Sequence, residues 1–213
     1  YIAFSTRTTS EEAQSRIHLA LRLLVLRKPL TVPLISLSFL VAQLSGSEIP
    51  SEKQSMAAVG NPPSVIESKG LCFLVFDSPK DSNLPTYIEE FKKHNVRHVV
   101  RVCEPTYDPA PLLAAGIQFY EMPYDDGSPP PPAVIKRWLS VVKQAKNEKS
   151  AIGVHCVAGL GRAPVLVAIA LIESGETPLL AVDFIRKARR GAINKVQLDY
   201  LRKYKKSGGC VIQ

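Results

Sequence analysis

The sequence predicts an α/β fold with a central, mostly parallel sheet flanked by helices. Two observations carry this prediction. Short apolar runs of strand length alternate along the chain with longer segments whose apolar residues recur at helical spacing. Glycine and proline separate these segments, and the chain contains no internal repeat. Strands that alternate with helices form parallel sheets, because each helix serves as the crossover between two strands.

Local signals place each element in turn. The apolar runs predict four strands, at 71–76, 98–103, 117–122 and 151–155. Helices are expected to start at Leu84, to span 109–115, 133–146, 163–174 and 178–189, and to run from 194 through 206. Proline in the first turn supports the first helix, Gly175 ends the fourth, and Asn194 with Gln197 forms a capping box for the last. The prolines at 129–132 form a loop, since they cannot donate backbone hydrogen bonds.

The composition is that of an ordinary globular protein, with 213 residues of which 46% are hydrophobic and 22% charged. This excludes a chain that is disordered throughout, and four cysteines are too few for a disulfide scaffold. No two cysteines have the spacing of zinc ligands. The net charge of +8 is compatible with nucleic acid, anionic membrane or phosphorylated partners and does not decide among them.

Residues 1–55 differ from the rest of the sequence. The first methionine is Met56, and the apolar stretch before it is broken by basic residues and prolines. The segment is either a signal peptide or anchor, or upstream sequence that precedes a true start at Met56. We favour the second interpretation, because the segment has no domain-like pattern. The expected organisation is therefore a leader at 1–55, a folded domain at 56–206 and a tail at 207–213.

The segment from Val154 to Pro164 carries the clearest chemical signal. A strand ends at Cys156, a loop that contains two glycines follows, and a helix begins near Arg162. Glycines let successive backbone N–H groups converge on one point, and the helix N-terminus adds positive partial charge there. A planar guanidinium binds two phosphate oxygens at once. The pattern predicts a phosphate-binding loop made of Val157, Ala158, Gly159, Leu160, Gly161 and Arg162.

Cys156 lies at the base of this loop. The surrounding N–H groups, helix dipole and guanidinium favour the thiolate, which is the attacking form of a cysteine. The expected reaction is in-line attack of Cys156 on phosphorus, followed by hydrolysis of the cysteinyl-phosphate. The alternative is an inert, buried cysteine in a chance C-x5-R spacing. The strand before Cys156, the glycines and the apolar helix after it argue against that alternative.

With His155 before Cys156 and Arg162 closing the motif, the sequence resembles the cysteine-dependent protein tyrosine phosphatases, whose signature is H-C-x5-R. It is similar in particular to the PRL phosphatases (phosphatases of regenerating liver). The stretches that carry this resemblance are 101–104, 125–127, 155–168, 184–186, 189–192 and 210–213. The resemblance extends from about Val65 to the last residue and does not reach residues 1–55. It implies the dual-specificity-like phosphatase fold, protein-tyrosine-phosphatase activity, and no metal or organic cofactor.

The resemblance assigns the general acid to Asp126, on a loop after the third strand. A carboxylic acid there protonates the leaving oxygen and later deprotonates the attacking water. Without the resemblance, Asp125 and Asp126 would be interpreted as turn residues before Gly127. The sequence departs from the family at Met122, where a tryptophan is typical, and this departure bears on the hinge and the closed position of the loop.

Two further residues gain roles from the resemblance. Ala163 replaces the serine or threonine that helps the thiolate leave in most tyrosine phosphatases, a loss typical of the PRL group. It implies slow turnover with accumulation of cysteinyl-phosphate. Cys103 matches a cysteine that forms a reversible disulfide with the nucleophile, here Cys156, and a thiolate beside a second thiol suits such a switch. From the sequence alone, a buried core cysteine is the favoured interpretation of Cys103.

The last four residues, 210–213, form a C-a-a-X box whose terminal glutamine points to a farnesyl group on Cys210. The basic cluster upstream consists of Arg202, Lys203, Lys205 and Lys206. One lipid chain anchors only marginally, and such a cluster supplies the second signal on an anionic membrane; otherwise the cluster is a solvated helix end. The expected location is the cytoplasmic face of the plasma membrane and endosomes, and partly the cytoplasm or nucleus without the prenyl group. A cytoplasmic anchor argues against a secretory leader.

Two classes of function stay open at this point. The enzyme hypothesis rests on Cys156, Arg162 and Asp126 and takes phosphoproteins or phosphoinositides as substrates. The binding hypothesis, implied by the resemblance and favoured by Ala163, holds that the loop binds CNNM-type magnesium transport mediators through their cystathionine-β-synthase-pair domain. The oligomeric state, a homotrimer among others, stays open as well. Nucleic acid is not an expected partner, because few aromatic residues lie among the basic residues of the tail.

Overall fold

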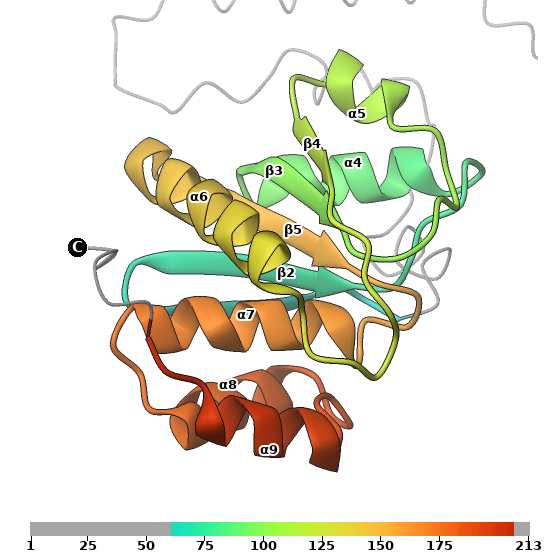
Figure 1. Ribbon diagram of the computed structural model, residues 1–213. Coiled ribbons are helices and arrows are strands. Elements are labelled where there is room, and N and C mark those ends of the chain that lie inside the picture. Colours follow the sequence, from blue (N-terminus) through green and yellow to red (C-terminus); the bar gives the residue numbers. More distant parts are fainter. Residues whose placement is uncertain (1–60, 207–213) are drawn as a thin grey trace, which may run out of the picture. The chain divides into compact units, whose positions relative to one another are not determined.

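The structure, a computed structural model, describes residues 61–206, so the expectations for residues 1–55 and for Cys210 lie outside it. In this range the strands are β1 (Ser64–Ser68), β2 (Leu71–Phe76), β3 (Val96–Arg101), β4 (Gln118–Glu121) and β5 (Ala151–His155). They form one sheet in the order β1-β2-β5-β3-β4 (Figure 1). The edge strand β1 is antiparallel to β2, and the other neighbours are parallel. The expected mostly parallel sheet is confirmed.

Helices cover both faces of this sheet. They are α4 (Leu84–Lys93), α5 (Ala110–Ala114), α6 (Pro132–Glu148), α7 (Arg162–Glu173), α8 (Pro178–Ala188) and α9 (Lys195–Lys203). Side chains alternate between the two faces along each strand. Leu74 and Phe76 therefore point into the cluster that α4 and α5 cover, while Phe73 and Val75 point into the larger cluster of α6, α7, α8 and α9.

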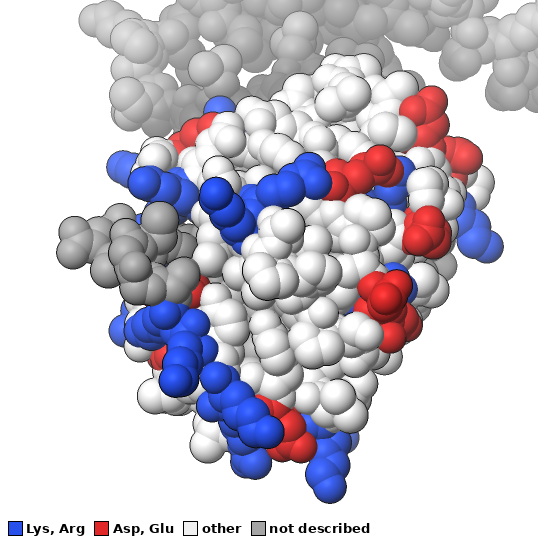
Figure 2. All heavy atoms as spheres, viewed as in Figure 1, with Lys and Arg blue, Asp and Glu red and all other residues white. Residues whose placement is uncertain are grey.

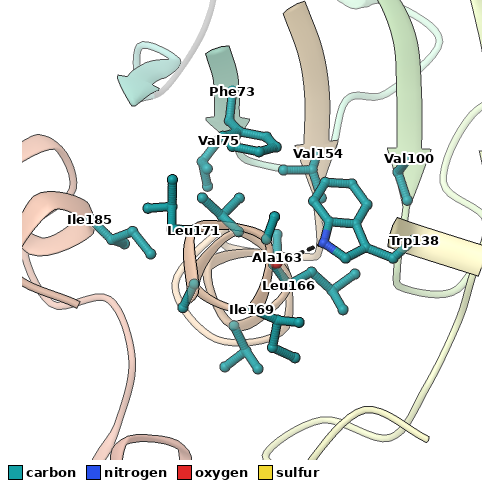
Figure 3. Close-up of a cluster of buried hydrophobic side chains, with 14 of the residues drawn as sticks. Phe73, Val75, Val100, Trp138, Val154, Ala163, Leu166, Ile169, Leu171 and Ile185 are labelled. Atoms are coloured by element: carbon teal, nitrogen blue, oxygen red, sulfur yellow. Dashed lines mark hydrogen bonds between the residues drawn. The ribbon is translucent and has the colours of Figure 1, made fainter. Parts of the chain in front are cut away.

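The helix α7 is enclosed by the rest of the domain. All twelve of its residues are buried, and they pack against the sheet, α6 and α8 (Figure 3). Trp138 of α6 lies against α7 and donates from Nε1 to the Leu166 carbonyl at 2.7 Å. A helix that is apolar on all sides is a core helix. Its burial fixes the N-terminus of α7, at Arg162, next to the end of β5.

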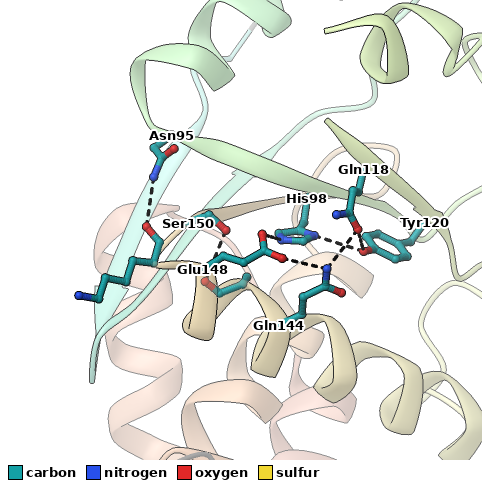
Figure 4. A network of polar contacts seen from close by, with 9 residues as sticks. Asn95, His98, Gln118, Tyr120, Gln144, Glu148 and Ser150 are labelled. Carbon is teal, nitrogen blue, oxygen red and sulfur yellow. Dashed lines mark hydrogen bonds and ion pairs between the residues drawn. The ribbon is translucent and has the colours of Figure 1, made fainter. Parts of the chain in front are cut away.

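A polar network attaches the C-terminal end of α6 to the sheet (Figure 4). His98 of β3 is fully buried, with Nε2 3.0 Å from Glu148 Oε2 and Nδ1 3.2 Å from the Tyr120 hydroxyl. Gln144 donates to the other carboxylate oxygen of Glu148 at 2.9 Å. The hydrogen bonds from Gln144 and then His98 hold the pKa of Glu148 below its usual value. Both ring nitrogens of His98 thus have partners, as burial of a polar side chain requires.

The predicted elements are present, with shifts at their ends. The strands at 71–76 and 151–155 and the capping box of α9 are confirmed. The strand expected at 98–103 lies at Val96–Arg101, although the Val102 N–H still bonds the His155 carbonyl at 3.0 Å beyond it. The last helix ends at Lys203, earlier than expected. The sequence does not predict β1, because a short edge strand with one polar face lacks a continuous apolar run.

Candidate active site

A cavity of about 310 Å³ lies at the loop that connects the end of β5 to the start of α7. Its lining comprises Asp126, Cys156, Val157, Ala158, Leu160, Gly161, Arg162, Gly191, Asn194 and Gln197. The structure therefore brings Cys156, Arg162 and Asp126 together, although Asp126 comes from the loop between β4 and α6. Of the residues predicted for the phosphate-binding loop, Gly159 alone is absent from the lining, because it is buried against the end of β2.

Arg162 is the first residue of α7, and its side chain is almost fully buried. Two reciprocal contacts hold it to the Asp126 loop: its Nη1 donates to the Tyr124 carbonyl at 3.2 Å, and the Tyr124 hydroxyl donates to the Arg162 carbonyl at 2.7 Å. Its Nε is buried and has no hydrogen-bond partner, although Asp126 Oδ1 lies 3.3 Å away. A buried cationic donor without a bonded acceptor favours binding of an anion in the cavity.

Asp126 lies at the open side of the cavity. Its side chain is 72% exposed, and Oδ1 accepts a hydrogen bond from the Gly127 N–H at 3.0 Å. The same oxygen lies 3.3 Å from Arg162 Nε, so the carboxylate stands beside the anion-binding group at the mouth of the cavity. Met122, which stands where the family has tryptophan, is 1% exposed at the start of this loop and packs in the larger core cluster.

His155 is fully buried directly before the nucleophile. Burial is the main cause that lowers its pKa to about 4, so the ring is neutral at pH 7. Its Nε2 lies 2.8 Å from the Tyr107 hydroxyl and its Nδ1 lies 3.1 Å from the Cys156 carbonyl. A carbonyl only accepts, so Nδ1 carries the proton and Nε2 accepts from Tyr107. This tautomer fixes the carbonyl of Cys156 at the end of β5.

Cys103 follows β3 and is buried in the same core cluster as Cys156. Burial raises the pKa of the Cys103 thiol, and the nearby Arg162 and Cys156 also act on it electrostatically. The Ser78 hydroxyl lies 4.0 Å from its sulfur. Both cysteines are free thiols here, and the disulfide between Cys103 and Cys156 stays a prediction.

Three lining residues, Gly191, Asn194 and Gln197, were not predicted as parts of the site. The sequence identifies Asn194 and Gln197 only as a helix cap, and both line the cavity. The Gln197 side chain is held because its Oε1 accepts from the Asn194 N–H at 3.1 Å. Its Nε2 lies beside Gly161, 3.2 Å from where a Cβ on that glycine would stand. The sequence signal that could have identified these residues as parts of the site was the position of the capping box, shortly after the arginine–glycine stretch 189–191.

The same residues offer no metal centre. Between residues 61 and 206, the structure holds no cluster of three or more histidine, cysteine or acidic side chains arranged to bind a metal ion.

Known proteins share this arrangement in sequence. Residues 77–176 match the family model described as "Polymorphic toxin system, DSP-PTPase phosphatase". A protein tyrosine phosphatase type IVA A of Dictyostelium discoideum is 54% identical over 160 residues, which cover 73% of this chain and 96% of that protein. Protein tyrosine phosphatase type IVA 3 of Homo sapiens is 52% identical over 153 residues, with 70% and 88% covered. The chain belongs to the protein tyrosine phosphatase type IVA (PRL) family.

Solved structures agree with this assignment. A protein tyrosine phosphatase from Leishmania major, 43% identical, matches with a TM-score of 0.62 over 68% of this chain and 99% of its own. The structure of PTPMT1 in complex with PI(5)P is 21% identical, with a TM-score of 0.53 over 61% of this chain and 87% of its own, and shares the fold. The predicted family, fold and enzyme class are therefore confirmed, and this PRL-family chain is a protein tyrosine phosphatase.

Proposed function

We propose that the chain hydrolyses phosphomonoesters of phosphoproteins or phosphoinositides in two steps, with Cys156 as nucleophile. One observation carries the proposal: Cys156, Arg162 and Asp126 line one cavity at the N-terminus of a buried helix. The reaction needs a thiolate, anion-binding groups and a proton donor, so the proposal includes no metal or organic cofactor.

In the first step the thiolate of Cys156 attacks phosphorus in line with the leaving oxygen. The S–P bond forms while the P–O bond to the leaving group breaks. Arg162 and the N–H groups of the loop bind the phosphoryl oxygens. The dianionic ester displaces Asp126 from Arg162 and, as a like charge, favours the protonated acid. Asp126 then donates this proton to the leaving oxygen.

In the second step Asp126 takes a proton from water, whose oxygen attacks phosphorus while the S–P bond breaks. Phosphate leaves, and Cys156 returns as a thiolate. Ala163, the second residue of α7, is fully buried and offers no hydroxyl to the departing sulfur. The second step is therefore slow, and cysteinyl-phosphate accumulates.

A rapid-mix assay with aryl phosphates tests this mechanism. We expect the full chain to release a burst of phenol equal to the amount of enzyme and then to turn over slowly, and we expect Cys156→Ser to abolish both phases. Asp126→Asn slows the burst by about 10²–10⁴-fold, the usual contribution of a general acid. The loss is larger for phenyl phosphate than for nitrophenyl phosphate, because nitrophenolate leaves well without a proton.

Asp125→Asn is the matched control, since Asp125 is the neighbouring exposed carboxylate and does not line the cavity. It leaves the burst unchanged. Equal losses in the two variants, or no burst from fully reduced protein, would contradict the proposed mechanism.

The redox proposal concerns Cys103. Oxidation of the Cys156 thiolate by peroxide to a sulfenic acid, followed by attack of Cys103 and loss of water, forms the disulfide and stops the first step. A thiol reductant restores the burst in the parent chain. In Cys103→Ser no disulfide forms, so further oxidation of Cys156 makes the loss irreversible. Full recovery of oxidised Cys103→Ser would contradict the switch.

The membrane proposal rests on the tail. A farnesyl group on Cys210 and the basic cluster together hold the enzyme on the cytoplasmic face of the plasma membrane and endosomes. Within the described range, no helix is long and apolar enough to cross a membrane. Loss of the tagged protein from cell membranes in Cys210→Ser tests this location.

A second candidate function is binding to the cystathionine-β-synthase-pair domain of CNNM-type transport mediators. The observation that favours it is Ala163, because slow hydrolysis leaves the cavity occupied by cysteinyl-phosphate and so couples occupancy to binding. Titration of the purified domain onto the reduced chain, with and without orthovanadate in the cavity, tests it. Binding that orthovanadate does not weaken would place the partner elsewhere.

A further inference from the structure

Four consecutive carbonyl groups of the phosphate-binding loop, at 157–160, accept hydrogen bonds from residues that do not line the cavity. The Val157 carbonyl accepts from the Ser78 N–H at 2.8 Å, and the Leu160 carbonyl accepts from the Ile193 N–H at 2.8 Å. The two carbonyls between them, of Ala158 and Gly159, accept from one side chain, that of Arg189, at 3.0 and 2.8 Å. Four consecutive acceptors of the loop are thus held by two segments that are distant in sequence: the residue Ser78 after β2, and the stretch between α8 and α9 that contains Arg189 and Ile193.

These bonds determine where the N–H groups of the loop point. In a trans peptide the carbonyl of one residue and the N–H of the next point in opposite directions. Carbonyls that face outward at 157–160 therefore turn the N–H groups of 158–161 toward the other side of the loop, where the cavity lies. None of these four N–H groups bonds an acceptor in the described part of the chain. Such converging, unpaired donors bind an anion.

Arg189 is itself held rigidly. The residue is 7% exposed and forms an ion pair with Asp77, at the end of β2. The guanidinium also lies within hydrogen-bond distance of the Val75 carbonyl and of the Ser64 hydroxyl, both at 3.4 Å. A buried guanidinium with this many acceptors has little freedom to leave the loop.

The backbone of the loop fits closely around this side chain. Gly159 has a φ of +62°, and a Cβ there would lie 2.7 Å from Arg189 Nη2 and 2.6 Å from the Phe76 carbonyl oxygen. The absence of a side chain at Gly159 is what lets the guanidinium reach both carbonyls.

We propose that Arg189 is a positioning residue of this phosphatase, which orients the N–H groups of Gly159 and Leu160 toward the phosphoryl group from behind the loop. The proposal deepens the proposed function and rests on it, since the loop must bind phosphate. Arg162 lines the cavity and contacts the substrate directly. Arg189 does not line the cavity and acts through the two peptide groups whose carbonyls it bonds. Ser78 and Ile193 hold the outer two peptide groups through their backbone and do not depend on Arg189.

Amide NMR of the full chain with inorganic phosphate tests this assignment residue by residue. In the parent chain, phosphate shifts the N–H signals of residues 158–161 downfield. In Arg189→Met the shifts of Gly159 and Leu160 are lost, while those of Ala158 and Gly161 remain. The burst rate constant falls by about 10²-fold, as small displacements of positioning groups cause. Arg189→Lys keeps the charge with a single donor group and recovers part of both.

Arg190→Met is the matched control, because it removes the same charge at the neighbouring, exposed position. It keeps all four shifts and the burst. Asp77→Asn keeps the guanidinium but loosens it, so a partial loss at the same two amides is expected even where an Arg189 variant fails to fold.

Three outcomes would overturn the proposal. If Arg189→Met folds, unchanged shifts at Gly159 and Leu160 in it exclude the positioning role. If Arg189→Met does not fold, unchanged shifts at these two residues in Asp77→Asn exclude it. If Arg190→Met loses the Gly159 and Leu160 shifts and the burst to the same extent, the cause is the loss of positive charge and not the contacts of Arg189. If phosphate does not shift the N–H signals of residues 158–161 in the parent chain, both the proposed function and this inference are excluded. This failure is distinguishable from the others because it is seen before any residue is substituted.

Discussion

The ring of His155 connects folding to pH at the scale of a single residue. Its pKa of about 4 in the folded protein lies below its value of about 6.5 in an unfolded chain. The folded state therefore binds fewer protons than the unfolded state between these values, and stability falls as the pH drops from 6.5 to 4. The shift corresponds to roughly 3 kcal/mol of unfolding free energy. Urea unfolding at pH 7 and pH 4.5 measures this loss.

His155→Gln removes this contribution, so its unfolding free energy changes less over the same pH range. His94→Gln is the control, because His94 is partly exposed and lies 3.2 Å from Glu90. It keeps the steep fall. A pH dependence that is identical in both variants would rule out His155 as the cause.

The substitution Ala163→Ser tests the proposal that the second step is slow because Ala163 offers no hydroxyl. A hydroxyl at the second position of α7 donates to the departing sulfur, and a hydrogen bond to a charged group contributes about 1.5–3 kcal/mol. Steady-state turnover is expected to rise about tenfold or more, while the burst rate constant stays the same. Ala168→Ser is the control, because Ala168 is equally buried in the same helix, and it is expected to leave steady-state turnover unchanged. A rise in both variants would contradict the assigned role.

Residues differ in how far their roles can be predicted from sequence. Cys156 and Arg162 are recognisable because strand, loop and helix follow one another directly in the chain. The assignment of Asp126 depended on the family resemblance, since two aspartates before a glycine are also a common turn. Arg189 bonds the loop and Gln197 lines its cavity from later elements, and only the tertiary structure brings them there.

At the scale of the element, the phosphate-binding loop depends on Gly159. Gly159→Ala forces a Cβ into the Phe76 carbonyl and the Arg189 guanidinium, in addition to the strain of a positive φ. We expect loss of phosphate binding and a fall of the burst rate by about 10²-fold. Gly175→Ala also has a positive φ of +111° but meets open space, so it costs stability alone. Calorimetric titration with phosphate separates the two, and equal phosphate affinity would refute the steric argument.

Elements with strong local signals were predicted well, and those that depend on neighbours were not. The strand β5 is buried on both faces and reads as a continuous apolar run, so its bounds are those predicted. The edge strand β1 gains its conformation from pairing with β2, which its own sequence does not reveal. The end of β3 at Arg101 could not be predicted for a similar reason. The next residue, Val102, is apolar like the strand, and its N–H still bonds the His155 carbonyl of β5, so the sequence gives no sign that the strand has ended.

At the scale of the whole molecule, the feature that bears on location is a basic cluster on one face of the described domain. Lys and Arg side chains gather at the lower left of the face shown, over α9 (Figure 2). The last turn of α9 carries Arg202 and Lys203, and the exposed Lys205 and Lys206 follow it. This basic cluster directly precedes the tail with Cys210, so under the membrane proposal the prenyl group and the positive charge would meet an anionic surface together. Neither signal alone anchors a protein stably.

Vesicle binding of the farnesylated chain is expected to need both signals. Replacing Lys205 and Lys206 by glutamine weakens binding to phosphatidylserine vesicles by about fivefold for each charge removed, since each contributes about 1 kcal/mol. Binding to neutral phosphatidylcholine vesicles does not change, and added salt removes the difference because it screens the charges. The pair Lys136→Gln and Lys143→Gln, exposed on α6, lowers the net charge equally and serves as control. If that pair weakens binding as much, net charge and not the cluster beside the tail attracts the membrane.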